Sequence, residues 1–146
     1  MRAARDGAEA RFDSFEPPAD GGLPPAEAIV SGPGEGERLV SGNRVTVLKA
    51  VLPHLCFAEF HFNGSAEGPE VHHHDSQVDS FYVLDGELEV TVEGSVHSAG
   101  PGTLASVPCG VRHTFRHRRG GRSRVLNVHA PDGGFGEFLR RVSTRG

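Results

Sequence analysis

Short stretches in which apolar and polar residues alternate follow one another along most of this 146-residue chain. The clearest lies at residues 55–62, where Cys, Ala, Phe and Phe alternate with a second set that contains Glu59 and His61. Successive side chains of a strand point to opposite faces, so this alternation predicts a half-buried β-strand. Further short strands are predicted at residues 28–30, 45–49, 81–84, 88–92, 103–107, 113–117 and 124–129.

The end of the chain has a different spacing. Phe135, Phe138, Leu139 and Val142 lie at intervals of three, four and seven residues, which predicts a short C-terminal helix. The rest of the chain is predicted to form about nine or ten short strands separated by turns. Many short strands with almost no helix indicate an all-β sandwich or barrel.

The composition supports this fold class and a single folded domain. Gly (20 residues) and Pro (10 residues) make up about a fifth of the chain, which suits tight turns between strands. Residues 1–26 are rich in Ala, Gly, Pro and charged residues, and we expect them to form a flexible N-terminal arm. Residues 27–146 are then long enough to form one domain with its own core.

Charge is unevenly distributed along the chain. Residues 1–111 contain 6 basic and 17 acidic side chains, whereas residues 112–146 contain 9 basic and 2 acidic ones. Six of the arginines fall between Arg112 and Arg124, where they could form a nucleic-acid or phosphate patch or a solvated hairpin. The acidic remainder of the chain favours the hairpin, so we expect no nucleic-acid partner.

The two cysteines and the N-terminus bear on cellular location. Cys56 and Cys109 are too few for a disulfide scaffold and lack CxxC spacing, so both are expected to be free thiols in a reducing compartment. The N-terminus has no apolar segment of the kind found in secretory signals, and no stretch approaches the ~20 apolar residues needed to cross a bilayer. We therefore expect a cytoplasmic protein without a membrane partner.

Three consecutive histidines form the most distinctive stretch for chemistry. On a strand His72 and His74 would share one face, while His73 would point the other way. Two imidazoles on one face can chelate a divalent metal ion, provided that other parts of the chain supply further ligands. His73 is expected to be exposed to solvent or to lie at an interface.

Two segments contain candidate ligands. The first reads HxH-x4-D-x6-G from His72, and the second reads G-x5-PxG-x2-H and ends at His113. In this order they resemble the two motifs of the cupin superfamily, and the resemblance covers roughly residues 27–140. It implies an all-β fold, the double-stranded β-helix (jelly-roll) barrel, which holds a metal ion through two His, one Glu and a third His. Carried over by position, the ligands would be His72, His74, Asp79 and His113.

The chain departs from the cupin motifs at three positions. Asp79 replaces the family glutamate and is one methylene shorter, so direct ligation, ligation through water and a supporting hydrogen bond to the ligands all stay open. His117 stands where the second motif has Asn, and core packing or a rim position is favoured over a fifth ligand. Gly68 precedes His72 by four residues, a shorter interval than the family shows.

Other polar residues are candidates for the barrel interior. Glu59, His61, Tyr82 and Asn127 could each project into a pocket, and exposure on the outer face is the alternative for each of them. Among these, Glu59 is the candidate for a pocket acid. We expect Asp79 or Glu59 to manage protons during a reaction.

The resemblance also implies a class of function. The chain looks like small bacterial single-domain cupins described as quercetin dioxygenase-like, which implies a metal-dependent dioxygenase-like oxidoreductase acting on a small organic molecule. The cofactor would be one divalent transition metal, with Fe, Mn, Ni, Cu and Zn all open. Two other functions stay open: a metal-containing binding or sensing module without turnover, and a non-redox isomerase or lyase. The resemblance further suggests a homodimer, with residues 28–30 as a strand that two copies could exchange.

Overall fold

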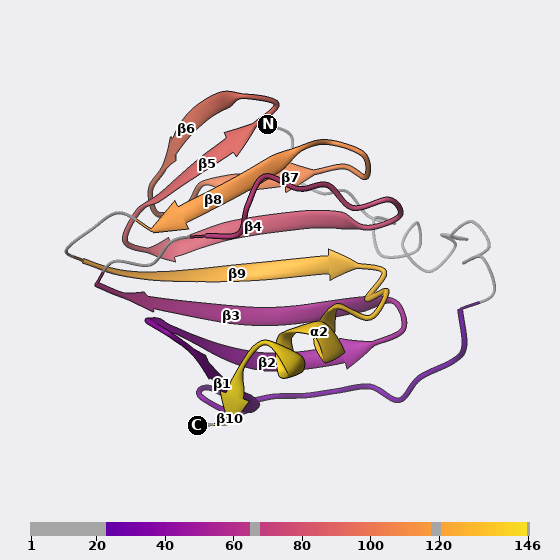
Figure 1. Ribbon diagram of the computed structural model, residues 1–146. Helices are drawn as coiled ribbons and strands as arrows, with labels where there is room; N and C mark the ends of the chain where they lie inside the picture. Colours follow the sequence, from indigo (N-terminus) through magenta and orange to yellow (C-terminus); the bar gives the residue numbers. More distant parts are fainter. Residues whose placement is uncertain (1–22, 65–67, 118–120, 146) are drawn as a thin grey trace, which may run out of the picture.

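The computed structural model describes residues 23–64, 68–117 and 121–145. These residues form ten strands and one helix (Figure 1), with bounds β1 Glu37–Ser41, β2 Arg44–Leu52, β3 Leu55–Asn63, β4 Val78–Asp85, β5 Leu88–Val92, β6 Ser95–Ala99, β7 Leu104–Val107, β8 His113–His117, β9 Arg122–Ala130, α2 Phe135–Arg141 and β10 Thr144–Arg145.

The strands pair in two antiparallel sheets. One sheet has the order β10-β1-β2-β3-β9-β4-β7, and the other has the order β6-β5-β8. In Figure 1 the smaller sheet lies at the top of the molecule, and the strands of the larger sheet follow one another down to β10. The neighbours in each sheet are mostly far apart in sequence, as expected for a double-sheet jelly roll. The predicted all-β jelly-roll barrel with a short C-terminal helix is confirmed.

Alternation along the strands places the core between the two sheets. On β3 every second residue from Cys56 to Phe62 is buried, as the sequence pattern predicts. The rings of Phe60 and Phe81 from the larger sheet both contact Phe115 of β8 in the smaller sheet, with ring centroids 6.4 and 4.9 Å apart. Each buried phenylalanine of this kind stabilises the fold by about 1.5–3 kcal/mol. The aromatic contacts therefore hold the sheets together.

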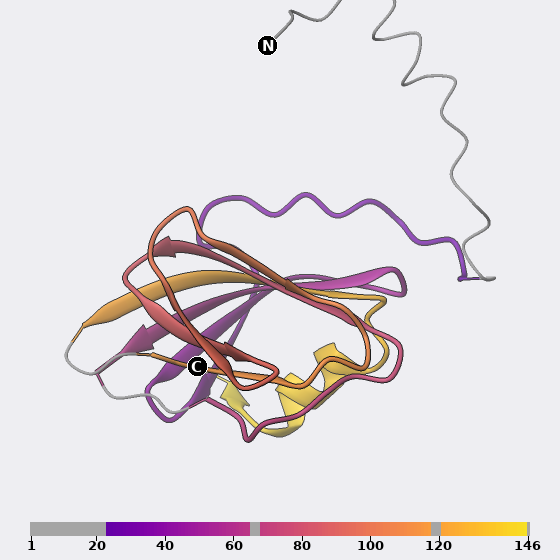
Figure 2. The ribbon, with the colours of Figure 1, turned by 90° about the horizontal axis from the view of Figure 1, so that it is seen from above.

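Some predicted elements differ from the observed ones. Residues 28–30 are extended but belong to no strand, and Val30 is 96% exposed. Here the chain is tied to the barrel by Lys49, whose ammonium donates to the carbonyls of Gly32 and Glu35 at 2.6 and 2.7 Å. Figure 2 shows this segment running along the outside of the barrel. The predicted strand at 28–30 is therefore wrong, and β1 and β6 were not predicted because their residues lack a clear apolar alternation.

Close packing against a neighbouring strand requires glycine at two positions. A Cβ on Gly68 would lie 1.5 Å from the backbone oxygen of Phe115, so any side chain would push the strand away. Gly86 has φ of +80°, and a Cβ there would lie 2.1 Å from the carbonyl oxygen of Arg122. The displaced Gly68 thus has a structural reason of its own, which is the close approach of its segment to β8.

Helix α2 packs across one face of the larger sheet. Its Gly136 lies against Val51 of β2, and Leu139 is buried in the core. Phe138 and Val142, which share the predicted helical spacing, are each 45% exposed. The predicted C-terminal helix is therefore confirmed, although only part of its apolar face enters the core.

The described residues do not test two of the predictions. Residues 1–22 lie outside the described residues, so the division into an arm (1–26) and a domain (27–146) stays a prediction. The homodimer also stays a prediction, because the structure contains one chain.

Cys56 is buried, Cys109 is exposed, and neither forms a disulfide. No helix within the described residues is both long and apolar enough to span a bilayer.

Candidate metal centre

The two segments predicted to supply ligands lie side by side. His72 and His113 face each other as an antiparallel bridge, with the His72 amide donating to the His113 carbonyl at 3.0 Å and the reverse bond at 2.8 Å. A further bond of 2.7 Å joins the Gly110 amide to the His74 carbonyl. Backbone pairing, rather than side-chain contact, therefore fixes the histidines against one another.

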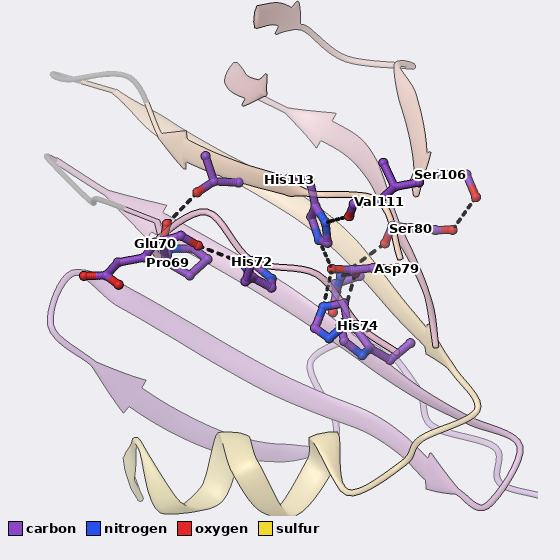
Figure 3. Close-up of polar contacts among 12 residues, drawn as sticks. Pro69, Glu70, His72, His74, Asp79, Ser80, Ser106, Val111 and His113 are labelled. Atoms are coloured by element: carbon purple, nitrogen blue, oxygen red, sulfur yellow. Dashed lines mark hydrogen bonds and ion pairs between the residues drawn. The ribbon is translucent and has the colours of Figure 1, made fainter. Parts of the chain in front are cut away.

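The four predicted ligands come together at the end of this bridge. One ligand atom from each of His72, His74, Asp79 and His113 lies within 4.8 Å of all the others. Asp79 Oδ2 is 2.9 Å from His113 Nε2 and 3.4 Å from His74 Nε2. Figure 3 shows the three rings gathered around the Asp79 carboxylate. Asp79 and His113 are buried, whereas His72 and His74 are partly exposed, so the cluster is accessible on the side of His72 and His74.

Backbone carbonyls orient two of the rings. The Nδ1–H of His72 donates to the Glu70 carbonyl at 2.8 Å, and that of His113 donates to the Val111 carbonyl at 3.0 Å (Figure 3). A neutral imidazole that donates from Nδ1 carries its lone pair on Nε2. Both rings therefore present Nε2 to the centre of the cluster, which is the arrangement found around metal-binding histidines.

The electrostatics of the cluster favour an ionised carboxylate. Burial alone would raise the pKa of Asp79, but hydrogen bonds from His113, His129 and Asn127 outweigh it and hold that pKa well below its usual range. Burial also lowers the pKa of His74, aided by the charge of His129. The pKa of His113 is raised: burial opposes the shift, but the bonds to Asp79 and to the Val111 carbonyl exceed it.

The donor set fits a divalent transition metal ion. His74 Nε2 is buried and has no hydrogen-bond partner, although it lies 3.4 Å from Asp79 Oδ2. Between His113 Nε2 and Asp79 Oδ2 a proton must be shared, because a lone pair and a carboxylate otherwise repel. A cation in place of that proton would satisfy all of these atoms at once. Three imidazoles and one carboxylate suit Fe, Mn, Ni, Cu or Zn, and the donor set does not select among them.

The shorter side chain of Asp79 still reaches the cluster. Its strand β4 lies between β9 and β7, where Asp79 is paired with His129 on one side and Val107 on the other. Oδ2 faces His113 and His74, while Oδ1 faces Asn127 and His129. One oxygen is therefore available to a metal ion and the other is held by the protein. This arrangement favours direct ligation among the three roles that the sequence leaves open.

Two residues complete the cluster, and the sequence indicated only one of them. Asn127, one of the candidates for the interior, donates from Nδ2 to Asp79 Oδ1 at 2.7 Å. His129 was not predicted; its Nε2 lies 3.2 Å from the same oxygen. Both follow Val125 at two-residue intervals on β9, and all three are buried. The alternation on β9 could therefore have indicated His129, but not that it would lie beside Asp79.

His129 also connects the cluster to helix α2. Its ring stacks on Phe135, with centroids 3.6 Å apart and planes 3° from parallel. Its Nδ1 is buried without a hydrogen-bond partner. The ring is thus held between the first turn of α2 and the carboxylate of Asp79, which fixes its position in the wall of the site.

The other polar candidates point away from the cluster. Glu59 lies on the face of β3 opposite Phe60, where it pairs with Arg124 and with His61 at 3.1 Å. Tyr82 is 41% exposed on the outer face of β4. The expectation that Glu59 is a pocket acid is therefore wrong in its placement, because side chains alternate and this register gives the inner face to Phe60.

The two remaining histidines of interest lie outside the cluster. His73 is exposed and lies 3.3 Å from Asp75, in agreement with the opposite face predicted for it. His117 is buried, stacks against Phe62 and bonds to Ser123 and to the Gly121 carbonyl. Of the two positions predicted for His117, core packing and a rim position, the structure shows core packing.

Three members of the cluster, His72, His74 and Asp79, line a cavity of about 850 Å³. Polar residues of the cluster form one part of the wall, and apolar residues of β3, β4, β8 and α2 form another. A cavity of this size accommodates a small organic molecule. A substrate inside it would therefore lie beside the open side of the four-residue cluster.

Comparisons with known proteins agree with the fold. The cupin domain family matches residues 58–129. The quercetin 2,3-dioxygenase of Bacillus subtilis (strain 168) is 28% identical over 93 residues, which cover 57% of this chain but 26% of that protein. The chain thus spans about a quarter of the length of this curated relative.

Solved structures show the same fold at low sequence identity. An RmlC-like cupin from Shewanella frigidimarina has a TM-score of 0.62 and 23% identity, covering 73% of this chain and 92% of that one. KdgF from Halomonas sp. has a TM-score of 0.57 and 24% identity, covering 63% and 83%. The Streptomyces nucleoside dehydratase Pac13 has a TM-score of 0.55 and 16% identity, covering 73% and 83%.

Proposed function

Because the chain belongs to the cupin superfamily, we propose that it is a metal-dependent enzyme of the dioxygenase-like oxidoreductase type that acts on a small organic molecule. The observation that carries this proposal is the cluster of His72, His74, Asp79 and His113, three members of which (His72, His74 and Asp79) line a substrate-sized cavity. Three imidazoles and a carboxylate that leave one side open are typical of sites where an ion binds both protein and substrate.

The four residues of the cluster are assigned to metal binding. His72, His74 and His113 would hold the ion through Nε2, and Asp79 through Oδ2. A divalent ion bound there acts as a Lewis acid on a substrate oxygen, and a redox-active one also supports dioxygen chemistry. Asn127, by its bond to Asp79 Oδ1, keeps the carboxylate from rotating away from the histidines.

Proton transfer is assigned to the pair formed by Asp79 and His129. Their side chains lie 3.2 Å apart, both are at least 98% buried, and both line the cavity. A proton can therefore be held on His129 Nε2 beside the ionised Asp79 Oδ1, without contact with bulk water. This assignment replaces Glu59, which lies on the outer face of β3.

The dioxygenase assignment is also supported by the curated relative. That protein is named a quercetin 2,3-dioxygenase, and the alignment with it covers 93 residues. Its name concerns a protein about four times the length of the aligned region, so the phenolic or other enolisable character of the substrate is part of our proposal.

Metal analysis and oxygen uptake test this function. We expect protein purified without added metal to contain about one Fe, Mn, Ni or Cu ion per chain, and to consume oxygen when a substrate from a panel of phenols and enols is added. Full occupancy by zinc with no oxygen uptake would reject the oxidoreductase. A bound metal with no turnover of any kind would indicate a binding or sensing module.

A non-redox isomerase or lyase is the second candidate. The observation in its favour is the buried Asp79–His129 pair beside the cluster, since moving a proton between carbon and oxygen needs an acid and a base but no electron acceptor. Structural neighbours include proteins titled a sugar phosphate isomerase and a nucleoside dehydratase. Turnover by the zinc-loaded protein under anaerobic conditions would favour this candidate over the oxidoreductase.

A further inference from the structure

A charged residue of the cavity has no function in the metal cluster. Arg44, at the start of β2, lines the same cavity as His72 and Asp79. The carbon at the centre of its guanidinium lies 5.2 Å from the centroid of the Phe60 ring. Its Nε is buried and makes no hydrogen bond. Burial also lowers the pKa of Arg44, which shows that its charge is partly removed from water.

Arg44 differs in this respect from three arginines of the barrel that form ion pairs. Arg116 pairs with Glu89 at 2.9 Å, Arg140 pairs with Glu37 at 2.9 Å, and Arg124 pairs with Glu59. Within residues 23–64, 68–117 and 121–145, no carboxylate forms an ion pair with Arg44. A partly buried guanidinium without an anionic partner is unfavourable, because the lost hydration of its Nε is not replaced by a hydrogen bond.

The acids of the cavity wall do not satisfy Arg44. Oδ1 of Asp79 is held by Asn127 and His129, and Oδ2 faces the candidate ligands His113 and His74. Glu70 is exposed, and Figure 3 shows its carboxylate directed away from His72. The cavity therefore contains a positive charge that the described part of the chain leaves available for a ligand.

The surroundings of Arg44 indicate what else the ligand contains. Phe60, Phe81 and Phe115 form an apolar wall beside it. Phe138 and Val142 of the C-terminal segment also line the cavity and are each 45% exposed, which is unusual for large apolar side chains. Such a lining binds a flat or aliphatic apolar body, while the guanidinium fixes one charged end of it.

We propose that Arg44 binds the carboxylate of a small organic acid whose apolar body packs against the phenylalanines of the cavity. The planar guanidinium presents paired N–H donors that match the two oxygens of a carboxylate. The proposal rests on the proposed function in one respect: the acid bound by Arg44 is the molecule that reaches the metal cluster. It assigns a substrate class, and it gives Arg44 a role separate from metal binding.

Binding of matched probes tests the assignment. Phenylacetate and phenylacetamide have nearly the same shape and differ in charge, and phenyl phosphate adds a doubly charged alternative. Calorimetric titration at millimolar concentrations should show phenylacetate binding to the wild type at least about tenfold more tightly than phenylacetamide. Arg44→Gln should remove this preference, whereas Arg124→Gln, which alters an arginine paired with Glu59 on the outer face, should retain it.

The same titrations on metal-free protein separate this proposal from the proposed function. Preference for phenylacetate that persists without metal supports Arg44, whereas preference lost with the metal would place the carboxylate on the ion and overturn the proposal. Failure of the proposed function is read independently, from metal content and oxygen uptake. Tighter binding of phenyl phosphate than of phenylacetate, or binding of no acid at all, would also overturn the assignment.

A stability measurement distinguishes ligand binding from a structural role for Arg44. If the guanidinium awaits a ligand, Arg44→Gln should unfold at the same temperature as the wild type or a higher one, because an unpaired desolvated charge is removed. A lower unfolding temperature together with unchanged probe binding would make Arg44 structural. If Arg44→Gln does not fold, Arg44→Lys can be tested instead. It retains the positive charge without the paired N–H donors of the guanidinium, and it should lose most of the preference for phenylacetate over phenylacetamide.

Discussion

Strand β8 begins and ends with a buried histidine, and the two differ in what surrounds them. His113 and His117 are four residues apart, and their exposed fractions are 1% and 5%. Both point into the barrel from the same face of the strand. Burial and strand position therefore do not distinguish a candidate ligand from a core residue.

The partners of the two rings do distinguish them. His117 donates from Nε2 to the Gly121 carbonyl at 2.9 Å and accepts from the Ser123 hydroxyl at 2.7 Å, so both nitrogens are satisfied by neutral groups. His113 instead faces the carboxylate of Asp79 and lies beside two further imidazoles. A buried histidine is thus structural where neutral groups complete its bonds, and a candidate ligand where charge and unpaired nitrogens collect around it.

The largest expected change in free energy is the loss of metal affinity in His113→Ala. Loss of one of four ligands should raise the dissociation constant for the metal ion by about a thousandfold, or about 4 kcal/mol. Competition with a coloured chelator measures this constant. His73→Ala is the matched control, because His73 is exposed and should leave the constant unchanged. Wild-type affinity in His113→Ala would mean that the ion binds elsewhere.

His117→Ala should lower the stability of the fold and leave metal affinity unchanged. It leaves a cavity beside Phe62 and removes the partner of Ser123, so we expect the free energy of unfolding to fall by about 3 kcal/mol. Urea denaturation measures this change, and metal affinity should stay at the wild-type value. Exposed His97 provides the control, since His97→Ala should change stability by less than about 0.5 kcal/mol. Weaker metal binding in a folded His117→Ala protein would contradict the comparison.

Asn127→Ala tests the neighbours of Asp79 rather than the ligands. Without its bond to Oδ1 the carboxylate loses orientation, and metal affinity should fall by about tenfold. Ser106→Ala removes a 2.8 Å bond to Ser80 at the exposed surface and should leave the affinity unchanged. An equal effect of both variants would show that the loss reflects general loosening of β4.

The smallest effect is expected at the neutral partner of His117. Ser123→Ala removes the hydrogen bond to the ring and the bond that the hydroxyl accepts from the Glu87 amide at 3.0 Å, so the free energy of unfolding should fall by about 1 kcal/mol with no change in metal affinity. Ser95→Ala, at an exposed position of β6, is the control for serine substitution in a strand. A change in metal content in Ser123→Ala would mean that the two ends of β8 are coupled.

Much of this protein followed from local sequence patterns. Alternation predicted most of the strands and the two-residue period of burial along β3, and the spacing from Phe135 to Val142 predicted α2. The same parity placed His72 and His74 on one face and His73 on the other. These predictions succeed because the directions of side chains along one strand or helix depend only on the local backbone.

What the sequence could not determine depends on pairing between distant strands. The placement of β9 between β3 and β4 sets His129 opposite Asp79 and gives Glu59 an outer-face partner, Arg124. Strand pairing also brings Asp79 beside the bridged His72 and His113. It places Arg44 in the wall of the cavity, where no carboxylate of the described residues forms an ion pair with it. The sequence by itself thus determined the strand pattern and the four candidate ligands. The tertiary structure decided their partners, because cross-strand neighbours depend on sheet order and register, which local periodicity does not specify.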